Sequence, residues 1–124
     1  MTEPVQFQSS FFSVVQEDDL CLVTMNRDQL TDDDNLELFG QDFTLLIEKH
    51  EICKFVLRLS RVRYMTSSAI GKLITLHRKV NRIGGSLVLC ELTPDVSATL
   101  DAARLLTYFT YRPDLAGAMA TFQS

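Results

Sequence analysis

Residues 55–71 read Phe55-Val-Leu-Arg-Leu-Ser-Arg-Val-Arg-Tyr-Met-Thr66-Ser67-Ser68-Ala-Ile-Gly71. Phe55, Leu57 and Leu59 fall on one face of a strand, because side chains alternate between the two faces of a sheet. A short basic loop then leads into three hydroxyl residues, and apolar residues recur after them at helical spacing. The stretch therefore predicts a strand, a loop and a helix whose N-terminus carries three hydroxyl groups.

Hydroxyl groups at a helix N-terminus have two interpretations. The unpaired backbone N–H groups and the positive end of the helix dipole favour an acceptor or an anion there. Thr66, Ser67 and Ser68 can simply cap the helix. Alternatively, Ser67 or Ser68 accepts a phosphate, which adds a charge of about −1.5 to −2. The residues themselves leave both interpretations open and do not separate the two serines.

Arg61 and Arg63 precede the hydroxyl residues and also have two interpretations. As strand-end residues, they are expected to be solvated, like most surface charges. Together with the helix N-terminus they would form an anion pocket, for the phosphate of a modified serine or of a bound nucleotide.

Length and composition predict one globular domain. The chain has 124 residues, of which 46% are hydrophobic and 23% charged, and a net charge of −4 that argues against a general nucleic-acid partner. Cys21, Cys53 and Cys90 lack metal-ligand spacing and lie in apolar runs, which indicates buried thiols in a reducing compartment. The first residues lack a signal peptide pattern and no apolar run would span a bilayer, so we expect a cytoplasmic protein with no membrane partner.

Periodicity and turn signals predict an α/β fold with a mixed β-sheet of four to five strands, an N-terminal hairpin and about four α-helices. We expect residues 1–10 to be a flexible N-terminus and residues 11–124 to form one domain. The expected strands are residues 11–16, 19–25, 54–60, 86–90 and 106–110; the expected helices are residues 34–50, 67–82 and 93–103, with a last helix from residue 113. Gly84 and Gly85 would end the second helix, because glycine accepts a left-handed backbone.

The residues indicate no enzyme, metal or cofactor. His50 and His77 lack a carboxylate at a useful spacing, and no Gly-x-Ser-x-Gly surrounds the serines. The aspartates at 32–34 lack calcium-loop spacing and are typical of a solvated loop and helix start.

This order of elements resembles the STAS domain, the family that includes bacterial anti-sigma factor antagonists. The signature Asp-Ser-Ser/Thr-Gly-Leu-Gly corresponds to Thr66-Ser67-Ser68-Ala69-Ile70-Gly71, after Tyr64-Met65. Gly84-Gly85, the strand Leu87-Val88-Leu89 and the helix start Thr93-Pro94 also resemble the family. Two positions depart from it: Thr66 replaces the aspartate, and Ala69 replaces a glycine.

The resemblance implies a signalling protein that controls transcription by binding an anti-sigma factor or a histidine-kinase-like ATPase. It implies phosphorylation on Ser68, or else Ser67, which weakens the complex. The implied partner-binding residues are Arg61, Arg63, Met65, Thr66, Ala69 and Lys72. Association with further copies of the chain is compatible with the family.

Two alternatives stay open. The first is a constitutive STAS scaffold that has lost the phosphorylation switch, as Thr66 and Ala69 indicate. The second is a sensor that binds a nucleotide or another small anion at Arg61, Arg63 and the helix start.

Overall fold

The computed structural model describes residues 7, 9–32 and 35–122. Its main sheet has the order β1-β2-β4-β6-β7, formed by β1 (Phe12–Glu17), β2 (Leu20–Met25), β4 (Lys54–Arg58), β6 (Ser86–Cys90) and β7 (Thr110–Arg112). The hairpin β1–β2 is antiparallel and the other neighbours are parallel. The helices are α1 (Leu36–Glu48), α2 (Ser67–Arg82), α3 (Pro94–Ala102) and α4 (Leu115–Ala120). The predicted α/β fold with a mixed sheet, an N-terminal hairpin and four helices is confirmed.

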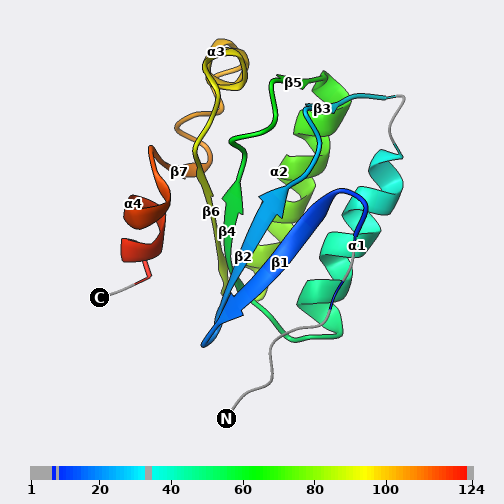
Figure 1. Cartoon of the computed structure of the whole chain (residues 1–124), viewed down its shortest axis with the longest axis vertical. Coiled ribbons are helices and arrows are strands. Elements are labelled where there is room, and N and C mark those ends of the chain that lie inside the picture. Colours follow the sequence, from blue (N-terminus) through cyan, green and yellow to red (C-terminus); the bar gives the residue numbers. More distant parts are fainter. Residues whose placement is uncertain (1–6, 8, 33–34, 123–124) are drawn as a thin grey trace.

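Helices cover both faces of the main sheet, with α1 and α2 on one side and α4 on the other (Figure 1). The central strand β4 shows why. Phe55 and Leu57 join the core that contains the buried residues of α1 and α2, whereas Val56 packs in a second cluster with Ala118 of α4. Because all three side chains are buried, β4 has apolar residues on both faces, as a covered parallel strand requires.

A second, two-stranded sheet pairs β3 (Gln29–Leu30) with β5 (Tyr64–Met65) in parallel. Both segments were expected to be loops, because two-residue strands carry no readable periodicity. This small sheet lies at the end of the domain where α2 begins (Figure 1). It therefore fixes the segment that leads into the hydroxyl residues.

The last strand differs from the prediction. Residues 106–110 were expected to form it, but β7 begins at Thr110, which pairs with Val88 of β6. The apolar run before it turns instead, since the N–H groups of Tyr108 and Phe109 both donate to the carbonyl of Leu105. Phe109 is buried in the core, which explains why the residues before β7 are apolar although they form no strand. The strand predicted at 54–60 also ends earlier, at Arg58.

The predicted end of α2 is confirmed. Gly84 has a φ of +78°, and its N–H donates to the carbonyl of Asn81, while the N–H of Gly85 donates to that of Val80. These two bonds form a Schellman motif. Gly85 has a second role, because a Cβ there would lie 2.1 Å from the carbonyl oxygen of Cys53.

Most of the N-terminus expected to be flexible lies outside the described residues, as do Asp33 and Asp34 of the acidic run. Phe7 stacks on Phe12 at 6.0 Å between ring centroids, and the Ser9 hydroxyl donates to Asp42 at 2.7 Å. These two residues contact the domain, and the boundary at residue 11 stays a prediction.

Candidate functional site

The segment before α2 is held by backbone hydrogen bonds to the β3 segment. The N–H of Arg63 donates to the carbonyl of Asp28 at 2.7 Å, and the N–H of Thr66 donates to that of Leu30 at 3.0 Å. The Thr93 hydroxyl also donates to the carbonyl of Val62 at 2.8 Å. The start of α2 is thus positioned by two separate parts of the chain, the β3 segment and Thr93.

Thr66 is the N-cap of α2. Its hydroxyl oxygen accepts from the N–H of Ala69 at 3.3 Å, so the capping interpretation is confirmed for this residue. The same hydroxyl donates to the carboxylate of Asp32 at 3.0 Å. Asp32 was expected to lie in a solvated loop and helix start, and its hydrogen bond to Thr66 was not predicted.

Ser67 and Ser68 occupy the first turn of α2 and are exposed. Within the described part of the chain, neither hydroxyl makes a hydrogen bond. Their exposure leaves both hydroxyl groups accessible from solvent without a change in the fold. Tyr64, just before them, is 56% exposed and joins the same surface; the sequence interpretation did not select it.

Met65 and Ala69 lie beneath this surface. Both side chains are buried in the main core, with Met65 4% and Ala69 1% exposed. In this structure they fix the position of the α2 start from below and offer a partner little surface, and their predicted role in partner binding stays a prediction. Burial follows from the pairing of Met65 with Leu30 and from the inward face of α2.

Arg61 and Arg63 are exposed. Arg63 lines a hollow of about 360 Å³ with Ser60, Thr93, Pro94 and Asp95. This hollow lies at the start of α3, not at the start of α2, and it includes a carboxylate. The anion pocket predicted from Arg61, Arg63 and the start of α2 stays a prediction.

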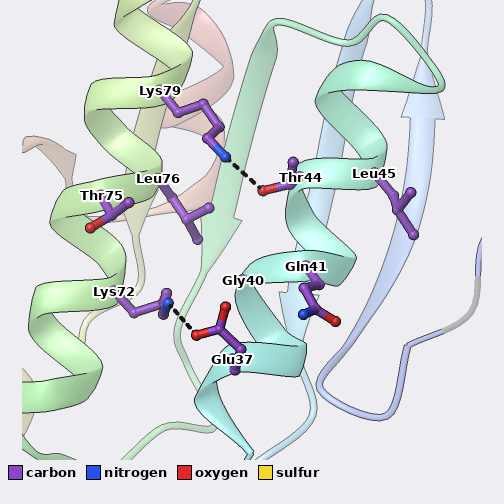
Figure 2. A pocket seen from close by; sticks show the side chains of 9 residues that line it. All are labelled: Glu37, Gly40, Gln41, Thr44, Leu45, Lys72, Thr75, Leu76 and Lys79. Atoms are coloured by element: carbon purple, nitrogen blue, oxygen red, sulfur yellow. Dashed lines mark hydrogen bonds and ion pairs between the residues drawn. The ribbon is translucent and has the colours of Figure 1, made fainter.

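Lys72 lies one turn after Ser68 and reaches across to α1. It borders a groove of about 530 Å³ between the two helices (Figure 2). We call this the α1–α2 groove and define it by Gly40, Thr44 and Leu45 on α1 and by Lys72, Leu76 and Lys79 on α2. Apart from Lys72, the sequence interpretation selected none of these residues, because a groove depends on how two helices pack.

The described ranges 7, 9–32 and 35–122 contain no group of three or more His, Cys, Asp or Glu side chains that would hold a metal ion. Over the same ranges, every helix is too short or too polar to cross a membrane.

Fold and site together define a single α/β module whose exposed serines begin a capped helix. The STAS domain model matches residues 7–118, so the chain belongs to the STAS family.

Three similar proteins are informative. BtrV of Bordetella bronchiseptica, named an anti-sigma factor antagonist, is 27% identical over 90 residues, which cover 73% of this chain and 77% of BtrV. The crystal structure of an anti-sigma factor antagonist from Thermotoga maritima has a TM-score of 0.78 and 20% identity, over 91% of this chain and 95% of that one. The Bacillus cell fate determinant SpoIIAA in its phosphorylated form has a TM-score of 0.67 and 13% identity, over 90% and 98%.

Proposed function

We propose that this protein is a phosphorylation-regulated interaction module that binds an anti-sigma factor or a related histidine-kinase-like ATPase. The contact surface is the segment around Arg61 and Arg63 together with the exposed side of α2. The unphosphorylated form binds, and a phosphate on Ser68 or Ser67 weakens the complex. The observation that carries this proposal is the exposure of both serines at a helix start that Thr66 already caps.

The family relationship supports a regulatory interaction. BtrV and the Thermotoga protein are both named anti-sigma factor antagonists, and SpoIIAA is known in a phosphorylated form. We transfer binding and phosphorylation to this chain because its exposed serines occupy the matching positions of the family signature.

Physical chemistry indicates how the phosphate would act. Thr66 and not a serine fills the capping role, so modification of Ser67 or Ser68 leaves the cap in place. A dianionic group near a helix N-terminus is tolerated because of the dipole. The domain therefore stays folded, and the partner responds to added charge and bulk at its contact surface.

A constitutive interaction module is the second candidate. The carboxylate of Asp32, hydrogen-bonded to Thr66, already places negative charge at the start of α2. This charge opposes the attraction of the helix dipole for a phosphate. In that case the domain binds its partner without regulation by a kinase.

The test starts with a pull-down from native lysate to isolate the bound ATPase, followed by affinity measurements on purified components. The variant S67D/S68D adds negative charge, and S67N/S68N is the neutral control of similar size. We expect the aspartate pair to weaken binding by at least about tenfold, as for a charge placed in an interface core, and the asparagine pair to bind more tightly than the aspartate pair. Equal affinities for the wild type and the aspartate pair would exclude the switch and favour the constitutive module.

A further inference from the structure

We propose that the α1–α2 groove is a second part of the partner interface and binds an acidic segment with a leucine-like side chain. This inference rests on the proposed function, because the occupant is a segment of the same ATPase. It extends the contact surface from the start of α2 to α1. The groove residues are those defined above (Figure 2).

The shape of the groove depends on Gly40. A Cβ at this position would lie 2.9 Å from Cδ of Lys72. Because Gly40 has no Cβ, the aliphatic part of the Lys72 side chain lies against α1. Figure 2 shows Lys72 and Lys79 both reaching from α2 toward α1, with Leu76 between them. The groove therefore has an apolar floor with an ammonium group at each end.

The charges in the groove favour an anionic occupant. Nζ of Lys72 is 3.5 Å from the carboxylate of Glu37, a side chain that is 75% exposed. Nζ of Lys79 donates to the neutral hydroxyl of Thr44 at 3.2 Å, and among the described residues it forms no ion pair. One weakly held carboxylate thus faces two ammonium groups. A carboxylate from a partner would pair with Lys79 without displacing a charged group.

An apolar side chain is the second requirement for the occupant. Leu45 lines the groove on α1 and is 44% exposed, whereas Leu76 is only 1% exposed. Burying the exposed surface of Leu45 under a leucine-like side chain is favourable in proportion to the area removed from water. Acidic residues on either side of that side chain would then face Lys72 and Lys79.

Position along α2 identifies the occupant as the same partner. Ser68, Lys72, Thr75 and Lys79 follow each other at intervals of four, three and four residues, which places them on one side of the helix. The groove therefore continues directly from the proposed phosphorylation site. A protein that covers Ser68 and extends along α2 reaches the groove next.

The test measures the affinity of the isolated ATPase for groove variants. L45E and K79E place negative charge in the groove, and K79R preserves the positive charge. Two matched controls lie away from the groove. V15E replaces Val15, an exposed apolar residue of β1, and R112E replaces Arg112, an exposed cation of β7. We expect L45E and K79E to weaken binding by at least about tenfold, and K79R, V15E and R112E to stay within about twofold of the wild type. Thermal unfolding of each variant checks the fold, and L45Q replaces L45E if that variant is unstable.

The outcomes separate this inference from the proposed function. If S67D/S68D weakens binding while L45E and K79E bind like the wild type, the groove proposal is overturned and the switch stands. Loss of self-association in L45E with unchanged affinity for the ATPase would assign the groove to a second copy of the chain and also overturn it. If the wild type binds no ATPase, both proposals fail.

Discussion

The hydroxyl of Thr66 donates a hydrogen bond of 3.0 Å to the carboxylate of Asp32 and accepts one from the N–H of Ala69. This hydroxyl connects the acidic segment after β3 to the first turn of α2. In the family signature an aspartate stands where this chain has Thr66. Here Asp32 supplies a carboxylate at the same helix start from a different segment of the chain.

The contact between Asp32 and Thr66 predicts energetic coupling between the two residues. Thr66→Val removes the cap and should lower the free energy of unfolding by about 1 kcal/mol. Asp32→Ala should cost less, about 0.5 kcal/mol, because the hydrogen bond is exposed. In urea unfolding of the single and double variants, the double variant should lose less than the sum of the two single losses. Strict additivity would show that the contact contributes nothing to stability.

Gly84 and Gly85 should respond differently to alanine. At Gly84 a Cβ would meet no atom within 4 Å. Gly84→Ala should therefore lower the free energy of unfolding by only about 1–2 kcal/mol, the cost of a left-handed backbone at a residue with a Cβ. At Gly85 the Cβ would overlap the Cys53 carbonyl, and Gly85→Ala should cost about 3 kcal/mol or more. Denaturant unfolding of both variants tests this order. A smaller loss for Gly85→Ala than for Gly84→Ala would contradict the packing described here.

His77 predicts a loss of stability in acid. Its ring is buried against Tyr108 and Phe109, and Nδ1 has no hydrogen-bond partner among the described residues. Desolvation lowers the pKa of His77 below its usual value of 6.5. Because the unfolded chain then binds the proton more readily, stability is retained above pH 6.5 and falls as the pH drops toward the folded pKa.

The test for His77 compares the wild type with His77→Gln, which does not titrate, in unfolding experiments between neutral and mildly acidic pH. The difference in free energy of unfolding should shift against the wild type as the pH falls. A difference that stays constant with pH would mean that His77 titrates equally in both states.

The three cysteines should differ in reactivity. Burial raises the pKa of the Cys21 thiol to about 12, and it also raises that of Cys90 to about 12. Cys53 is only half-buried. Since the thiolate is the reactive form, iodoacetamide at mildly alkaline pH should label Cys53 first, with Cys21 and Cys90 reacting only on unfolding. Peptide mapping after short labelling checks this, and early labelling of Cys21 would contradict the burial.

Local signals were enough to predict much of the fold. The cap at Thr66 and the glycine pair at the end of α2 both depend on neighbouring residues, and each is confirmed. The predicted start of β7 was wrong, because the apolar run before Thr110 fits a buried turn as well as a strand. Only the pairing of Thr110 with β6 distinguishes a strand from a turn here.

The site depends more on contacts between distant segments. Asp32 and Thr66 are 34 residues apart, and the strands that bring them together have two residues each. Such short strands leave no pattern in the sequence. The α1–α2 groove requires the close approach of Lys72 to Gly40, which depends on helix packing. The exposure of Ser67 and Ser68, in contrast, follows from their place in the first turn of an amphipathic helix.

The most direct test of the central proposal is phosphosite mapping by mass spectrometry on the protein isolated from its native cells. The site geometry predicts a single phosphate on Ser67 or Ser68 in a fraction of the molecules, and none on the S67A/S68A variant expressed in the same cells. An unmodified protein under every growth condition, or a phosphate elsewhere in the chain, would contradict the proposed switch.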